Sequence, residues 1–254
     1  MFPGNIRSIN DNSPNNNNGP NWREYLQQAW DKVPLFVRIV IILSVVLYLF
    51  SFFEFLQANL LLYLINIPSS TVYKFYVWSI FTSVFINLSI LNLLFAMISW
   101  VPSSIQQEQK VGTIKYMLNF LMHSISIELL YVIISMILFK IFPTMSNTPS
   151  SGLWPLLMAE ITLSCCSDPE KPVVMMFIPY PFKAKYYPWA LTGFFALING
   201  FQIQYDAIIG IIYAYFYFFY LKNYLSISDS LIALIDNLFP FKYLKNLKGW
   251  LSFI

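Results

Sequence analysis

The sequence predicts an all-α, polytopic membrane protein with six transmembrane helices. Of its 254 residues, 57% are hydrophobic and only 11% are charged, whereas soluble domains carry about 25% charged residues. Several apolar runs approach the roughly 20 residues that cross a bilayer as a helix. Because these runs do not alternate polar with apolar residues, transmembrane strands are a poor alternative.

The first 33 residues predict a disordered polar tail. This segment is too poor in apolar groups to fold alone, and it contains a cluster of asparagines: Asn10, Asn12, Asn15, Asn16, Asn17 and Asn18. No apolar run lies near Met1, so we expect no cleavable signal peptide, and the first transmembrane helix directs insertion.

The membrane domain is predicted over residues 34–221. Its six apolar spans cover residues 36–57, 77–100, 115–142, 151–166, 186–201 and 204–221. Helix-breaking prolines fall between these runs: Pro68 follows the first, Pro102 closes the second and Pro143 ends the third. Four more prolines lie between residues 167 and 185, which predicts a loop there.

The basic residues give an independent test of this segmentation. Six spans place both termini and the loops at 101–114 and 167–185 on one side of the membrane. The other side then carries only Lys74 and Lys140 of the chain's 15 basic residues. The positive-inside rule therefore predicts both termini in the cytosol, or in the matrix or stroma of an organelle.

Residues 222–254 predict an amphipathic helix at the membrane interface. Apolar residues recur there at helical spacing, and basic and aromatic residues follow: Leu231, Leu234, Ile235 and Leu238, then Lys242, Lys245, Lys248 and Trp250. Such segments bind anionic headgroups while their apolar face enters the acyl boundary. A helix that docks onto a protein partner is the alternative.

The net charge of +3 is small and dispersed, which argues against a nucleic-acid partner. The adjacent cysteines Cys165 and Cys166 offer no metal-ligand spacing, and we expect no metal and no cofactor. The expected partners are membrane lipids and other membrane proteins.

A set of short motifs, in order along the spans, resembles the rhomboid-like superfamily over about residues 36–221. The second helix of that family opens with an aromatic-Arg-x-x-Thr pattern, of which Trp78 and Thr82 remain here. A Glu-x-x-x-Gly step follows, supplied by Glu108 and Gly112. The stretch around residues 187–210 looks like derlins, and residues 151–155 look like the UBA-associated rhomboid-like proteins, although no ubiquitin-binding domain is expected in the residues after the sixth span.

The resemblance implies a six-helix rhomboid-like bundle without protease activity. The fourth helix of active members begins with Gly-x-Ser-Gly, so Ser151 and Gly152 stand at the nucleophile position. The sixth helix of active members carries Ala-His-x-x-Gly; here Ala207 occupies the histidine position and Gly210 the glycine position. The base is therefore missing.

A serine hydroxyl needs a neighbouring base to become a nucleophile. The chain's single histidine, His123, lies in the third span, whereas the family's catalytic histidine belongs to the sixth. We therefore expect His123 to hydrogen-bond a neighbouring helix or to lie near the membrane surface. Asn87 and Asn92 stand where active members place oxyanion donors, and we interpret them as interhelical hydrogen-bonding groups.

Ionisable residues inside a membrane are by default candidate functional sites. Glu54 and Asp206 lie near predicted span ends, where they can reach water, whereas Glu128 and Glu160 are better placed to be buried. A proton path and a structural polar contact are both open for the buried pair.

The leading hypothesis is a rhomboid-like pseudoprotease that binds transmembrane clients or partners, and the likeness to derlins implies protein quality control in the endoplasmic reticulum. The alternative is a structural accessory subunit of a larger, conceivably organellar, membrane complex. A transporter that uses Glu128 or Glu160 ranks third.

Overall fold

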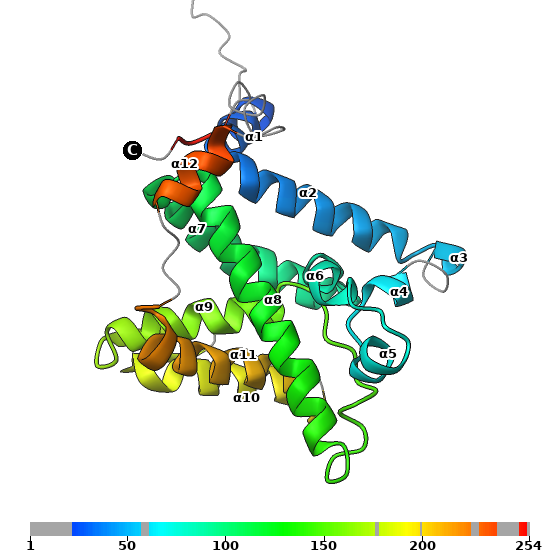
Figure 1. Cartoon of the computed structure of the whole chain (residues 1–254). Helices are drawn as coiled ribbons and strands as arrows, with labels where there is room; N and C mark the ends of the chain where they lie inside the picture. Colours follow the sequence, from blue (N-terminus) through cyan, green and yellow to red (C-terminus); the bar gives the residue numbers. More distant parts are fainter. Residues whose placement is uncertain are drawn as a thin grey trace, which may run out of the picture.

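The computed structural model describes residues 22–56, 61–175, 178–198, 200–224, 229–237 and 249–252. These residues form a predominantly helical fold (Figure 1). In chain order the helices are α1 Trp22–Asp31, α2 Leu35–Phe50, α3 Glu54–Leu56, α4 Leu62–Leu64, α5 Pro68–Tyr73, α6 Ser79–Thr82, α7 Ile90–Val111, α8 Thr113–Leu138, α9 Trp154–Ser167, α10 Tyr187–Ile198, α11 Tyr205–Phe216 and α12 Asp229–Asn237. A π-helical turn, Tyr217–Leu221, extends α11.

The long helix α8 runs through the middle of the fold and contacts most of the other helices (Figure 1). Helices α9, α10 and α11 lie together beside it, and α11 packs closely along α9. The main core fills the space between α2, α7, α8, α9 and α11, with Val37, Trp100, Phe120, Leu157 and Ile211 almost fully buried in it. Two smaller apolar clusters lie beside it, one around Leu61, Ile65 and Ile86 and one around Tyr131, Met145 and Ile209.

The first two predicted spans are interrupted. Helix α2 ends at Phe50 rather than near residue 57, because residues 51–53 turn and the Ser51 hydroxyl bonds the carbonyl of Tyr48 at 2.6 Å. The second span breaks between Phe85 and Ile90, and its two parts are bent by 84°. At the bend the carbonyl of Ser83 accepts hydrogen bonds from the Ile86 amide at 3.0 Å and from the Gly152 amide at 2.8 Å.

The prediction that Pro102 closes the second span is wrong, and so is the loop predicted at 101–114. Helix α7 continues through Pro102 to Val111. Proline removes one helical hydrogen bond, but the following turns are rich in good helix formers and are held by tertiary contacts of Glu108. Gly112, with φ of 85°, is the single residue between α7 and α8.

The later spans fall where the sequence predicted them. Helix α8 confirms the third, and α9, α10 and α11 occupy the fourth, fifth and sixth. Among the described residues, α8 is the one helix long and apolar enough to cross a bilayer by itself. If each of two bent helix pairs is counted as a single span, three segments qualify. Helices α9 and α10 have only 14 and 12 residues, so six crossings stay a prediction.

Two other regions differ from the prediction. Residues Trp22–Asp31 form helix α1 instead of a disordered tail, and the asparagine cluster lies outside the described residues. The proline-rich loop contains an antiparallel hairpin of strands β1 Pro172–Met175 and β2 Ile178–Lys183. Proline is tolerated here because the sheet has only two strands, so each has a free edge that needs no donor.

The C-terminal segment is partly described. Helix α12 confirms a helix at the predicted place, whereas Lys242, Lys245 and Lys248 lie outside the described residues. Residues 249–251 return to the beginning of α2, where the Leu35 amide donates to the Gly249 carbonyl at 2.9 Å, and Leu251 bonds Thr113.

Candidate functional site

The residue at the nucleophile position, Ser151, lines a cavity of about 390 Å³. The structure brings it together with three other predicted site residues, since Asn87, Asn92 and Asp206 line the same cavity. They come from the break in the second span, the start of α7, the loop before α9 and the start of α11. Trp154 and Gln204 close one wall through a hydrogen bond of 2.8 Å.

Gly152 fits this site because it lacks a side chain. Its φ of +80° is a conformation that L-residues rarely adopt, and a Cβ atom there would collide with the Asn87 side chain. Asn87 is buried at 3% exposure, and its amide nitrogen has no hydrogen-bond partner among the described residues. The interhelical role predicted for Asn87 and Asn92 stays a prediction.

Ala207 and Gly210 lie on the face of α11 that packs against α9. Ala207 is fully buried, and a Cβ atom at Gly210 would overlap the carbonyl of Pro155. The neighbouring Asp206 accepts a hydrogen bond from the Ala207 amide at 2.8 Å. The position that matches the family's histidine is thus filled by a methyl group in a close helix–helix contact.

His123 is elsewhere in the molecule. Its Nδ1 atom lies 2.8 Å from the Tyr213 hydroxyl, and its ring packs edge-on against Tyr217, so α8 is joined to the end of α11. It lines a separate cavity of about 280 Å³ rather than the cavity of Ser151. The structure therefore does not assemble a Ser151 and His123 dyad.

Glu128 is the centre of a buried polar network. Its two carboxylate oxygens accept hydrogen bonds from the Asn66 amide at 2.6 Å and the Ser150 hydroxyl at 2.8 Å. The Thr71 hydroxyl donates to the side-chain oxygen of Asn66, Oδ1, at 2.9 Å and lies 3.0 Å from the Ser79 hydroxyl. The network fastens the segment before α5 and the loop before α9 onto the middle of α8.

Sequence reasoning singled out Glu128 but missed its two partners, Asn66 and Ser150, and the two residues that extend the network, Thr71 and Ser79. Asn66 was the one with a visible signal, because an amide in an apolar run between two isoleucines needs a buried partner. Ser150, Thr71 and Ser79 are small hydroxyl residues of the kind found throughout the spans. Their role follows only from tertiary contacts.

The motif residues Trp78 and Thr82 hold the short helix α4. The Trp78 indole donates to the Tyr63 carbonyl at 2.9 Å, and the Thr82 hydroxyl donates to the Leu64 carbonyl at 2.7 Å. The carbonyls of so short a helix have no backbone donors within it, and these two side chains supply the missing donors. The pattern therefore stabilises the irregular segment between α2 and α7.

The Glu108 and Gly112 step joins three parts of the chain. The buried carboxylate of Glu108 accepts from the amides of Phe36 and Val37, at 3.1 and 3.0 Å, at the beginning of α2. The Thr113 hydroxyl also donates to it at 2.8 Å. A carboxylate is favourable there because the first amides of a helix lack partners and carry partial positive charge.

Glu160 on α9 has a different environment from Glu128. Its Oε2 atom is buried and has no hydrogen-bond partner among the described residues. The Trp100 indole lies near the carboxylate, but its N–H group likewise makes no hydrogen bond of standard geometry. Glu160 stands between the 280 Å³ cavity and a larger one of about 680 Å³.

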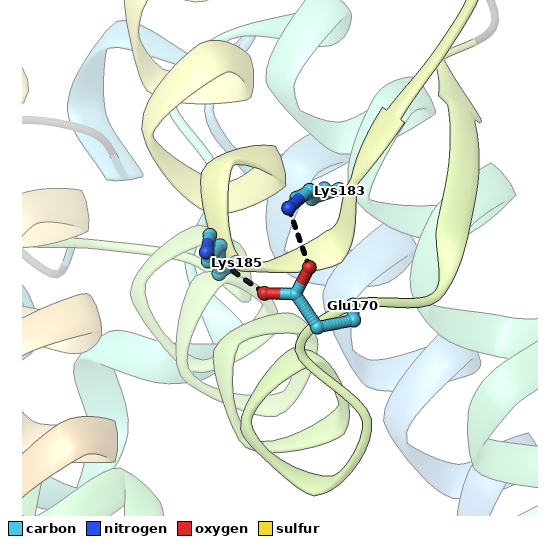
Figure 2. Close-up of polar contacts among 3 residues, drawn as sticks. All are labelled: Glu170, Lys183 and Lys185. Atoms are coloured by element: carbon cyan, nitrogen blue, oxygen red, sulfur yellow. Dashed lines mark hydrogen bonds and ion pairs between the residues drawn. The ribbon is translucent and has the colours of Figure 1, made fainter.

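The hairpin after α9 carries a cluster of surface ion pairs (Figure 2). Glu170 accepts from Lys183 at 2.6 Å and from Lys185 at 2.8 Å. Hydrogen bonds from these two ammonium groups lower the pKa of Glu170 to about 2. The three residues hold the hairpin against the turn that follows α9. No group of residues suited to a metal ion occurs in the described part of the chain.

The sequence profile of the Der1-like family matches residues 33–236, most of the chain. The chain belongs to the Der1-like family. Rhomboid-like protein 15 of Arabidopsis thaliana is similar, at 22% identity over 225 residues that make up 83% of this chain and 52% of that protein. The chain therefore spans about half the length of this curated relative.

This Der1-like protein is an integral membrane protein of the rhomboid-like superfamily. The described residues agree with that assignment, because large apolar side chains such as Ile42, Leu49, Ile98 and Ile137 are exposed on the outer surfaces of α2, α7 and α8. A surface of this kind belongs in lipid. The resemblance seen in the motifs is confirmed by the family match.

Proposed function

We propose that this Der1-like protein is a pseudoprotease: it binds the transmembrane segments of other membrane proteins without cleaving them, in quality control at the endoplasmic reticulum. One observation carries the proposal. The cavity of Ser151 lacks an imidazole, because Ala207 fills the matching position and the chain's single histidine bonds Tyr213 in another cavity. Without a base the serine hydroxyl is a poor nucleophile.

Short helices support the binding function. At about 1.5 Å per residue, the 14 residues of α9 and the 12 of α10 span roughly 21 and 18 Å, whereas the hydrocarbon core is about 30 Å thick. Helix α9 is largely buried, whereas α10 exposes Trp189, Leu197 and Ile198, so lipid beside α10 thins to match it. A thinner hydrocarbon layer lowers the free energy needed to move a polar client segment.

The polar cavity at Ser151 supplies hydrogen-bonding groups beside that thinned region. Asn87, Asn92 and Gln204 line it, and Leu88 on its rim is 45% exposed. Amide groups can satisfy a polar residue of a client helix inside a membrane. The proposed clients are therefore transmembrane segments that carry a polar residue.

The proposed topology places both termini in the cytosol. It is supported by the meeting of three segments: the beginning of α2, the turn between α7 and α8, and residues 249–251 contact one another. These are the segments that the distribution of lysine and arginine assigns to one side.

Site-specific photo-crosslinking tests client binding. The protein is reconstituted in bilayers with a photoreactive residue at Leu88, or at Ile137 on α8, which is 70% exposed. We expect a transmembrane peptide with a central asparagine to crosslink at Leu88 several times more strongly than an all-leucine peptide, and Ile137 to show no preference. Equal crosslinking at both positions would overturn the proposal.

Co-purification separates this function from the structural alternative. Client binding predicts varied, substoichiometric partners after mild detergent extraction. Stable one-to-one recovery of a single membrane complex would instead show a structural accessory subunit.

A further inference from the structure

The 280 Å³ cavity is built from the ends of four helices. Gln107 is near the end of α7, Tyr116 to His123 lie near the start of α8, Ser164 and Ser167 end α9, and Tyr217 to Lys222 follow α11. In the topology proposed above, these helix ends lie on the side whose loops carry most of the basic residues. In that topology the cavity lies at the level of the lipid headgroups rather than of the acyl chains.

An acidic side chain lines the cavity, and the Trp100 indole near it makes no hydrogen bond of standard geometry. Glu160 lines it, and the buried Oε2 atom of this carboxylate accepts no hydrogen bond from the described residues. Buried acceptors nearly always have a hydrogen-bond partner, so an acceptor without one in the protein indicates a bound ligand, ion or water. A cation that carries N–H donors would both neutralise and hydrogen-bond this oxygen.

Aromatic side chains and a basic group also line the cavity. Tyr116, Phe120, Tyr217 and Phe218 line the cavity, and aromatic faces attract cations. At the rim, the Lys222 ammonium lies 4.8 Å from the centre of the Phe218 ring and is exposed. The cavity is thus lined both by an acid whose Oε2 atom is buried and by an exposed base.

We infer that this cavity binds the headgroup of a zwitterionic phospholipid, with the ammonium beside Glu160 and the phosphate beside Lys222. An ethanolamine headgroup fits better than choline, because its ammonium has N–H groups that can donate to Oε2, whereas the nitrogen of choline is fully methylated and has none. The exposed Phe219 and Tyr220 at the same helix end are typical of the interfacial aromatic belt. This site is separate from the cavity of Ser151 and does not depend on client binding.

Native mass spectrometry of the purified, delipidated full chain tests the site. The probes are vesicles of phosphatidylethanolamine, phosphatidylcholine or phosphatidylglycerol. We expect retention in the order ethanolamine, choline, glycerol. Glu160→Gln should lower retention of phosphatidylethanolamine about tenfold, as expected for a lost charged hydrogen bond, whereas Glu54→Gln, at an exposed glutamate, should change it less than about twofold.

Lys222→Gln is the second variant, and since Lys222 is exposed, folding should not suffer. It should lower retention of both zwitterionic lipids alike, because they share the phosphate, and Lys74→Gln at another exposed lysine should not. Stronger binding of phosphatidylglycerol that is insensitive to Glu160→Gln would overturn the inference. Equal affinity for glycerophosphoethanolamine would also overturn it, because the ligand would then be a soluble molecule. A third contradicting result is unchanged lipid retention in Glu160→Gln together with lost crosslinking of a lysine-bearing peptide.

Discussion

The side-chain amide of Asn66 donates a hydrogen bond of 2.6 Å to the carboxylate of Glu128, across 62 positions of sequence. The same carboxylate accepts from Ser150. Asn66, Glu128 and Ser150 are all buried, so neither donor can turn to water if the acid is removed. The segment before α5 and the loop before α9 are therefore both bonded to one side chain of α8.

Replacement of this acid should destabilise the fold strongly. Glu128→Ala leaves the Ser150 hydroxyl buried without its acceptor and the Asn66 amide with only the backbone carbonyl of residue 128, at 3.3 Å, and we expect a loss of about 2–4 kcal/mol in the free energy of unfolding. Glu54→Ala, at an exposed glutamate, is the matched control and should cost less than about 0.5 kcal/mol. Thermal unfolding in detergent, followed by circular dichroism, measures both; similar curves would contradict the network.

Glu108 should control the beginning of α2. Glu108→Ala removes the acceptor of the Phe36 and Val37 amides, and loss of a comparable cap costs about 0.5–2 kcal/mol. Hydrogen exchange at these two amides should accelerate, while the exposed neighbour Gln109→Ala should leave it unchanged. Unaltered protection in Glu108→Ala would show that the carboxylate does not hold this helix.

The contact of α9 with α11 predicts opposite effects at two helical glycines. Gly210→Ala places a Cβ atom against the Pro155 carbonyl and should cost about 1–3 kcal/mol through overpacking. Gly193→Ala meets no atom within 4 Å and should stabilise α10 by up to about 1 kcal/mol through helix propensity. Chemical unfolding of the two variants gives the sign of each, and a stable Gly210→Ala protein would refute the close approach.

The hairpin predicts a pH dependence confined to acid. Hydrogen bonds from Lys183 and Lys185 lower the pKa of Glu170 from its ordinary 4.5 to about 2. A carboxyl whose pKa is lower in the folded chain contributes stability above the unfolded value, and that contribution is lost as pH falls from about 4.5 towards 2. A carbon-13 titration should return the Glu170 pKa towards 4.5 in a Lys183→Gln, Lys185→Gln double variant. An unchanged Glu170 pKa in the double variant would show that the two lysines do not stabilise the carboxylate.

The sequence predicted those parts of the fold that depend on local patterns. Long apolar runs located α8, α9, α10 and α11, because the length of a continuous apolar run is a local property of the sequence. The motif order placed Ser151, Asn87, Asn92 and Asp206 in elements that do form one cavity. Asp206 was expected only to reach water, and its place in that cavity needed the fold.

Tertiary contacts decided the rest. Pro102 predicted the end of a span, but α7 continues beyond it, and the contacts of Glu108 with α2 stabilise the turns that follow. The hairpin at 172–183 was hidden among prolines that usually indicate loops. Asn66 and Ser150 acquire their role only by meeting Glu128. No local pattern encodes a partner many residues away.

The most direct test of the account is a cleavage assay with purified protein in bilayers. The substrate is a transmembrane peptide already shown to crosslink at Leu88, and Ser151→Ala is compared with the unaltered protein. We predict that both proteins bind the peptide and that neither produces fragments above the level of empty bilayers. Fragments formed by the unaltered protein and abolished in Ser151→Ala would show that the serine has a base after all, and that the protein is a protease.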